Sequence, residues 1–246
     1  MKILIIPDVH GRPFWRYAEE NVNDFDKIVF LGDYHDPYYY EGISEDASLH
    51  NMRDLFNFAR QNTNKCVMLC GNHDLSYIRN MDVGADRCDT LNYKEVSALF
   101  SENKDLLRLA YAIDADGIEV LFTHAGVLPG WKDIVMPDVP ANAEDIAKEL
   151  NLWIEEERES DALSHVSHIR GGMNRYGSCV WADLGEFPNE RPFPFYQIFG
   201  HTQTYHQENG KLVFEGIITD ACACLDDHAP HILYDGKIST VPMRQS

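Results

Sequence analysis

The chain has 246 residues, of which 44% are hydrophobic and 25% are charged, an ordinary composition for a globular protein. Its formal net charge of −19 disfavours nucleic acid as a partner, because an excess of carboxylates repels polyanions. No apolar run is long enough to cross a bilayer, and the first residues do not resemble a signal peptide. We therefore expect a cytoplasmic protein with no membrane partner, whose six cysteines are buried reduced thiols.

The first half of the chain alternates apolar strands with helices. Short apolar runs, typical of strands covered on both faces, predict strands at residues 3–6, 27–31 and 65–69. Helices are predicted over 14–22, 44–59 and, for the most part, 93–107. Pro13 opens the first of these helices, and Ser44 can cap the second.

The second half is richer in strands. Residues 109–113 and 118–123 flank Asp116-Gly117, which predicts a hairpin. An amphipathic helix with an acidic, solvated face is predicted over 143–159, and a proline-rich loop over 187–194. Two more hairpins are predicted at Asn209-Gly210 and Asp235-Gly236. One domain over 1–246, with two packed sheets and helices outside, is the simplest fit.

Polar residues of the types that bind metals follow five of the predicted strands. The five blocks are Asp8-Val9-His10-Gly11, Gly32-Asp33-Tyr34-His35-Asp36, Gly71-Asn72-His73-Asp74, Thr123-His124-Ala125-Gly126 and Gly200-His201-Thr202-Gln203. Any one block is more often a turn or a satisfied core histidine than a ligand site. The carboxyl ends of strands share one edge of an open α/β sheet, so the five together indicate one convergent polar cluster.

In this order the blocks resemble the signature of the calcineurin-like metallophosphoesterases, over residues 8 to 203. The protein-phosphatase and diadenosine tetraphosphatase branch of that family is the most similar. The resemblance implies an α/β fold in four layers, with two mixed β-sheets flanked by helices. It also implies a paired-metal site.

The resemblance implies that six residues are metal ligands. Asp8 and His10 would bind the first metal, Asp33 would bridge both metals, and the second would be held by Asn72, His124 and His201. A mixed oxygen and imidazole set suits Mn²⁺, Fe²⁺ or Zn²⁺ better than Ca²⁺ or Mg²⁺. We expect two divalent cations, Mn²⁺ first, with iron or zinc as alternatives.

By the same resemblance, His73 is the proton donor to the leaving group, and Asp36 orients its ring. A hydroxide on the metals would attack phosphorus directly. The expected activity is hydrolysis of a phosphate monoester, and the expected partner is a phosphorylated substrate. A phosphoprotein, a nucleotide and a small phosphate ester are all compatible with the sequence.

The chain departs from the family pattern in two places. Gln203 stands where many phosphodiesterases have a second histidine, and it either ligates the first metal or lies outside its ligand shell. Pro37-Tyr38-Tyr39-Tyr40 replaces the phosphate-gripping arginine that usually follows the second block. Arg170 is the best replacement, because a guanidinium fork suits phosphate, although it could equally be a surface arginine beside a turn.

Several readings of these residues stay open. His35 and His168 either line the site or are ordinary loop histidines, and residues 38–40 either line the pocket or only pack. A phosphodiesterase or dinucleoside polyphosphate hydrolase is the alternative activity. A non-catalytic scaffold on the same fold is a remote alternative, because the ligands and His73 are all present. The sequence leaves the oligomeric state open.

Overall fold

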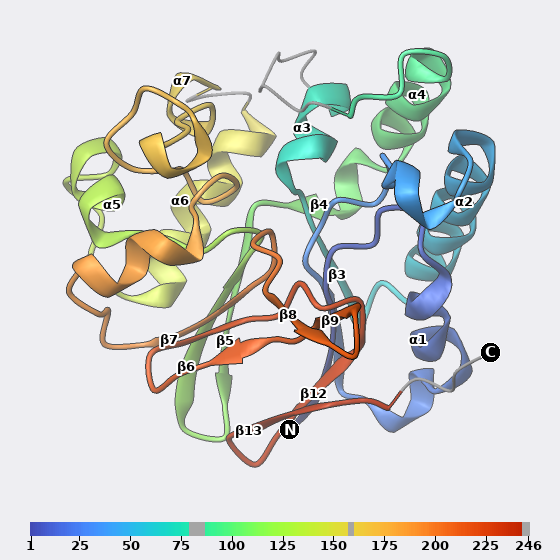
Figure 1. The fold of residues 1–246 in the computed structure, drawn as a ribbon. Coiled ribbons are helices and arrows are strands. Elements are labelled where there is room, and N and C mark those ends of the chain that lie inside the picture. Colours follow the sequence, from blue (N-terminus) through green and yellow to red (C-terminus); the bar gives the residue numbers. More distant parts are fainter. Residues whose placement is uncertain (79–86, 157–159, 243–246) are drawn as a thin grey trace. The chain divides into compact units, whose positions relative to one another are not determined.

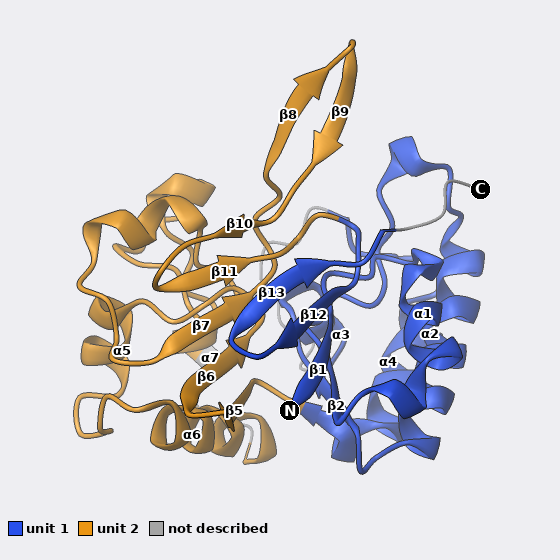
Figure 2. Ribbon diagram, turned by 90° about the horizontal axis from the view of Figure 1, so that it is seen from below, with its two compact units in different colours: residues 1–107, 228–246 blue, residues 108–227 orange. Residues whose placement is uncertain are grey.

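The computed structural model describes residues 1–78, 87–156 and 160–242. The chain divides into two compact units (Figure 2), of which unit 1 is residues 1–107 with 228–246 and unit 2 is residues 108–227. Each unit contains a mixed β-sheet together with helices, so the expected α/β class is confirmed. The expectation of a single domain stays a prediction. No described helix combines the length and the apolar character needed to cross a membrane.

Unit 1 is built on a sheet with the strand order β13-β12-β1-β2-β3-β4. Its parallel strands are β1 (Lys2–Ile6), β2 (Lys27–Phe30) and β3 (Cys66–Leu69), which confirms the three predicted strands. The side chains of Ile3 to Ile6 are fully buried, as expected of a strand covered on both faces. The remaining strands are β4 (Leu107–Arg108) and the predicted hairpin of β12 (His231–Tyr234) and β13 (Lys237–Thr240), which pairs antiparallel with β1.

The helices of unit 1 are labelled in Figure 1: α1 (Arg16–Glu20), α2 (Glu45–Gln61), α3 (Asn72–Ile78) and α4 (Tyr93–Glu102). Ser44 caps α2 as predicted, since its hydroxyl accepts from the Ala47 N–H at 3.2 Å. The helix predicted over 14–22 is wrong in detail, because 3-10 turns flank a short α1. The one predicted over 93–107 ends at Glu102 and gives way to a 3-10 turn and β4. Helix α3 was not predicted.

Unit 2 is built on a sheet with the order β10-β11-β7-β6-β5. Strands β5 (Ala110–Ala115) and β6 (Ile118–Thr123) form the predicted hairpin. Its two turn residues, Asp116 and Gly117, have φ of 58° and 89°, as a tight hairpin turn requires. Strand β7 (Tyr196–Phe199) lies parallel to β6 and to β11 (Cys222–Cys224), and β10 (Ile217–Ile218) closes the sheet.

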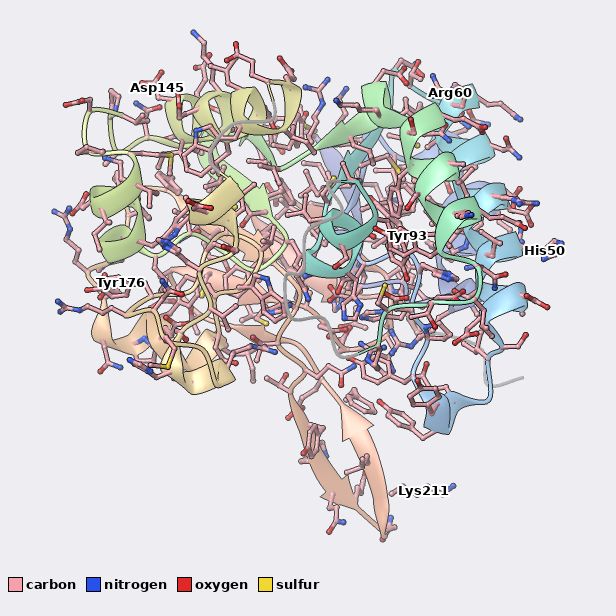
Figure 3. All side chains as sticks on the ribbon, turned by 90° about the horizontal axis from the view of Figure 1, so that it is seen from above. His50, Arg60, Tyr93, Asp145, Tyr176 and Lys211 are labelled. Carbon is pink, nitrogen blue, oxygen red and sulfur yellow. The ribbon has the colours of Figure 1, made fainter. Side chains whose placement is uncertain are left out.

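The helices of unit 2 are α5 (Pro129–Val135), α6 (Ala143–Glu155) and α7 (Ser160–Leu163). Helix α6 ends at Glu155, earlier than predicted, and residues 157–159 of the predicted helix lie outside the described residues. The segment predicted as a loop over 187–194 begins inside a 3-10 helix, Leu184–Asn189. The predicted hairpin of β8 (Tyr205–Glu208) and β9 (Lys211–Phe214) extends away from the rest of unit 2, with Lys211 near its tip (Figures 2 and 3).

The six cysteines are all free. Four of them are buried as expected, but Cys66 and Cys88 are only half-buried. Burial raises the pKa of the Cys66 thiol to about 12, which keeps it protonated at neutral pH.

The loops that follow β2 and β3 approach each other closely at two glycines. Gly32 has a φ of +108°, which side chains rarely allow. A Cβ on Gly32 would lie 2.5 Å from the backbone nitrogen of Gly71. Position 32 therefore needs glycine both for its conformation and for its space.

The carboxylate of Asp74 joins the same two loops. Its Oδ2 accepts from the N–H groups of Asp33 and Gly71, both at 2.8 Å, and its Oδ1 accepts from Tyr34 N–H at 3.1 Å. The side chain is 1% exposed, so these bonds are shielded from water. Asp74 thus fixes the position of the chain at the carboxyl ends of β2 and β3.

We predict that Gly32→Ala destabilises unit 1 more than Gly42→Ala. Gly42 also has a positive φ, of +70°, but its Cβ would meet nothing within 4 Å, so it isolates the conformational cost of about 1–2 kcal/mol. The backbone clash at Gly32 adds about 1–3 kcal/mol. Urea denaturation of both variants measures the difference, and equal losses would contradict the close approach.

We also predict that Asp74→Asn lowers the free energy of unfolding by about 1–3 kcal/mol, because the amide leaves at least one buried N–H without its acceptor. Asp54→Asn is the matched control. Asp54 pairs with Arg16 at the surface, where an ion pair contributes about 1 kcal/mol or less. Urea denaturation at pH 7 compares the two, and a loss at Asp74 no larger than at Asp54 would refute its bridging role.

Candidate metal centre

Three predicted ligands from the ends of β1 and β2 lie together in unit 1. Asp8, His10 and Asp33 each offer one ligand atom, and these atoms lie within 4.8 Å of one another. The three side chains are no more than 2% exposed. Buried carboxylates are costly unless they are paired or bind a cation, so this cluster is a plausible cation site on physical grounds.

The tautomer of His10 tests whether a metal fits. Its Nδ1 lies 2.9 Å from the carbonyl oxygen of His35, which only accepts, so Nδ1 carries the hydrogen. Its Nε2 lies 3.4 Å from Oδ2 of Asp33. Burial, followed by neighbouring positive charges, holds the pKa of His10 well below its ordinary value, so the ring is neutral. Two acceptor atoms then face each other, so His10 and Asp33 fit a divalent cation and would serve as its ligands.

The backbone at these positions is strained. His10, Asp33 and Asp36 have φ values of 42°, 52° and 58°, in the left-handed region that residues other than glycine seldom adopt. Such residues persist where the surrounding structure holds them, and they gather at functional sites. The strain is therefore independent support for a functional role of this edge of the sheet.

His73 and Asp36, predicted as the proton donor and its partner, lie in direct contact. His73 Nδ1 donates to Asp36 Oδ2 at 2.7 Å. The other oxygen of Asp36 accepts from the Tyr77 hydroxyl and, at 3.0 Å, from the Asp89 N–H. Burial lowers the pKa of His73, but the carboxylates of Asp33 and Asp36 outweigh it and raise the pKa overall. The two carboxylates favour the protonated ring, whereas the positive charge of Arg87 opposes it.

Asn72 completes the predicted set in unit 1. It opens α3, is 2% exposed and directly precedes His73, whose N–H donates to Oδ1 of Asp33 at 3.1 Å. Unit 1 therefore gathers its predicted residues at the carboxyl ends of β1, β2 and β3.

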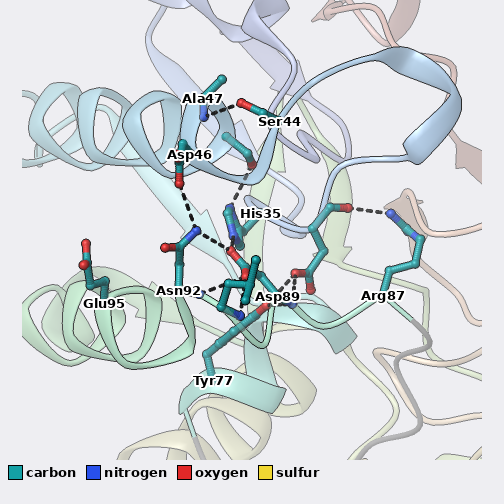
Figure 4. Close-up of polar contacts among 12 residues, drawn as sticks. His35, Ser44, Asp46, Ala47, Tyr77, Arg87, Asp89, Asn92 and Glu95 are labelled. Atoms are coloured by element: carbon teal, nitrogen blue, oxygen red, sulfur yellow. Dashed lines mark hydrogen bonds and ion pairs between the residues drawn. The ribbon is translucent and has the colours of Figure 1, made fainter.

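A network of hydrogen bonds around His35 adjoins this cluster (Figure 4). The ring of His35 lies between Oδ2 of Asp89, at 3.1 Å, and the hydroxyl of Ser48, at 2.8 Å. Both ring nitrogens are thus engaged, and His35 contributes to the cluster through its carbonyl contact with His10. Sequence reasoning missed Tyr77 and Asp89, because no local pattern marks either residue.

Arg87 is a further residue that sequence reasoning missed. Its guanidinium donates to the carbonyl oxygen of Asp36 (Figure 4) and lies with Cζ 3.6 Å from the centre of the Tyr38 ring. Its second terminal nitrogen lies 3.4 Å from Nε2 of His73. The only signal for it in the sequence was the missing arginine after Asp36.

The three tyrosines that follow Pro37 differ in their surroundings. The Tyr38 ring meets the His10 ring edge-on, with centroids 5.0 Å apart. Tyr39 and Tyr40 are 83% and 67% exposed. Tyr38 therefore lines the cluster, and the other two extend toward solvent.

Unit 2 brings its two predicted ligands together. His124 follows β6 and His201 follows β7, and these strands are parallel neighbours. Nε2 of His124 lies 3.1 Å from Nδ1 of His201, and both side chains are buried. His201 also has a positive φ, of 64°. Two imidazoles at the ends of adjacent strands form the second half of the predicted ligand set.

Arg170 lies beside this pair. Its guanidinium forms an ion pair with Asp183 at 2.9 Å and donates to the Thr202 hydroxyl at 2.9 Å and the His201 carbonyl at 3.4 Å. Its role in phosphate binding stays a prediction. His168 is exposed and contacts the Gly172 carbonyl, as an ordinary loop histidine would. Gln203 is half-buried.

No curated protein sequence matches the chain. Similar solved structures include a protein serine/threonine phosphatase from Saccharomyces cerevisiae, at 13% identity over 100% of this chain and 81% of that one, with a TM-score of 0.48. An archaeal phosphodiesterase is 13% identical over 98% and 99%, with a TM-score of 0.35. A hypothetical protein from Pyrococcus horikoshii is 9% identical over 100% and 88%, with a TM-score of 0.46. These scores are too low to support an argument about function.

The family comparison is decisive. A model of the calcineurin-like phosphoesterase family matches residues 1–205, which is most of the chain. The matched range includes every predicted metal ligand and the His73–Asp36 pair. The chain therefore belongs to the calcineurin-like phosphoesterase family.

Proposed function

We propose that this protein hydrolyses phosphate monoesters with the help of two bound divalent cations. Membership of the family makes it a hydrolase of phosphoesters in the broad sense. The observation that carries the finer proposal is the facing pair of acceptors in unit 1, His10 Nε2 and Asp33 Oδ2, 3.4 Å apart. A buried site of this kind needs a cation, and a proton donor lies beside it.

The proposed ligands follow the assignment made from the sequence. Asp8 and His10 would hold one cation, Asn72, His124 and His201 would hold the second, and Asp33 would be a ligand of both. His124 and His201 belong to unit 2. Bound cations would supply an acidified water and neutralise the phosphoryl oxygens. The oxygen and imidazole donors favour Mn²⁺, with iron or zinc as alternatives.

His73 has the geometry of a general acid. Its Nδ1 is engaged by Asp36, so its Nε2 is the atom that would give a proton to the departing alkoxide. Tyr77 and the Asp89 N–H hold Asp36 in place from the other side. Asp36 keeps the imidazole oriented and compensates its positive charge.

Two departures from the family pattern bear on the substrate. Gln203 in place of a second histidine resembles the protein-phosphatase branch, which supports a monoester over a diester. Arg170, beside the His201 carbonyl, is proposed as a phosphate contact from unit 2. The alternative, hydrolysis of diesters or dinucleoside polyphosphates, is a possible outcome of the assays below.

We predict that the purified protein binds about two Mn²⁺ per chain and hydrolyses p-nitrophenyl phosphate. His10→Ala removes one ligand and is expected to lower the metal content and the activity. His50→Ala is the matched control, because His50 is an exposed histidine whose Nδ1 contacts only the Asp46 carbonyl among its described partners. Elemental analysis and a colorimetric assay measure both effects.

A wild-type protein that binds no divalent cation would refute the proposal. Faster hydrolysis of bis-p-nitrophenyl phosphate than of the monoester would instead favour the phosphodiesterase alternative. Equal metal loss in His10→Ala and His50→Ala would remove His10 from the ligand set.

We further predict that His73→Ala slows alkyl phosphates by about 10²–10⁴-fold, the usual contribution of a general acid. Aryl phosphates with acidic leaving groups should lose far less, because p-nitrophenolate leaves without a proton. Comparing kcat for a phosphorylated serine peptide and p-nitrophenyl phosphate tests this. Equal losses on both substrates would exclude His73 as the proton donor.

A further inference from the structure

Arg87 is held in a defined orientation. Its guanidinium stacks on the Tyr38 ring at 3.6 Å and donates to the Asp36 carbonyl. In the described parts of the chain, no carboxylate lies within ion-pair distance of it. An arginine carries five donor hydrogens and a permanent charge, so this one retains donors for a ligand.

Two acidic side chains that line the same cavity as Arg87 already accept from other donors. Asp36 accepts from His73, Tyr77 and the Asp89 N–H. The Asp89 carboxylate accepts from His35 and from two backbone N–H groups, at residues 91 and 92 (Figure 4). These bonds compensate the charge of both carboxylates by donors other than Arg87.

Other arginines close to the predicted ligands are neutralised. Arg12, next to the carbonyl of Asp8, forms a double contact with Glu41 at 2.9–3.0 Å. Arg170 pairs with Asp183 at 2.9 Å. Among the arginines described beside the predicted ligands, Arg87 thus differs from Arg12 and Arg170 in having no carboxylate partner.

Arg87 also borders open space. It lines a cavity of about 250 Å³ together with Asp36, Glu45 and Asp89. The acidic members would repel an anion, and Arg87 supplies the opposing positive charge. One terminal nitrogen of Arg87 lies 3.4 Å from His73 Nε2, the atom that would protonate the leaving group. An oxygen of the phosphoryl group would therefore meet Arg87 next to the bond that breaks.

We infer that Arg87 binds the phosphoryl group of the substrate and selects the dianionic group of a monoester. The Tyr38 stack and the Asp36 carbonyl fix the plane of the guanidinium, so its fork meets two phosphoryl oxygens with little loss of entropy. A diester carries one negative charge less and one free oxygen less, so it gains less from this contact. The inference rests on the proposed function, because it places the phosphoryl group beside His73.

The test measures binding of inorganic phosphate to the Mn²⁺-loaded protein by calorimetry, together with KM for p-nitrophenyl phosphate. Arg87→Gln keeps a donor for the Asp36 carbonyl and removes the charge. It should weaken phosphate binding and raise KM by ~10- to 100-fold each. Arg87→Lys keeps the charge without the fork. Its phosphate affinity and its KM should therefore lie between those of Arg87→Gln and those of the wild type. Arg53→Ala, which removes a surface arginine paired with Glu95, is the matched control and should leave both constants unchanged.

Wild-type phosphate affinity in Arg87→Gln would overturn the inference, and continued hydrolysis by that protein would leave the proposed function standing. If the wild type binds phosphate through Arg87 but hydrolyses no monoester, the proposed function fails and the anion site remains. Metal content is measured for every variant. If Arg87→Gln loses its metals, the phosphate affinity of Arg87→Lys tests the inference instead. A wild-type affinity in Arg87→Lys would rule out a forked contact.

Discussion

The structure of unit 1 depends on the burial of four carboxylates at the ends of three adjacent strands. Asp8, Asp33, Asp36 and Asp74 are each no more than 2% exposed. Burying charge is unfavourable unless donors or cations compensate it. Asp74 accepts from three backbone N–H groups, and Asp36 accepts from a histidine, a tyrosine and one N–H. Asp8 and Asp33 each offer a ligand atom that lies, with one from His10, in a group no more than 4.8 Å apart, and this group fits a bound cation.

Directing these groups to one place requires unfavourable backbone conformations. His10, Asp33 and Asp36 adopt left-handed conformations immediately after their strands. The bond that His10 N–H donates to the Asp33 carbonyl, at 2.7 Å, and the bonds that Asp74 accepts from the loop after β2 hold those conformations. The ligand positions are therefore determined by the scaffold before any ligand binds, which is the preorganisation that a catalytic centre requires.

The two units contribute chemically different parts. Unit 1 carries the carboxylates, the His73–Asp36 pair and Arg87, whereas unit 2 carries the His124–His201 pair and Arg170. Each unit therefore places at least one arginine beside its predicted ligands. Local positive charge of this kind allows an acidic chain to bind an anion.

Local chemistry determined what the sequence could predict. Apolar runs marked β1, β2 and β3, Ser44 marked the start of α2, and Asp-Gly and Asn-Gly pairs marked the hairpins, because each signal depends on residues a few positions apart. The ordered motifs likewise identified the family. Tertiary packing alone decided the rest. Nothing near Arg87 in the sequence indicates that it contacts Asp36, and no local pattern shows that Asp74 joins two loops or that Tyr77 supports Asp36. Those contacts join residues far apart along the chain, and they form only when the whole of unit 1 buries its core.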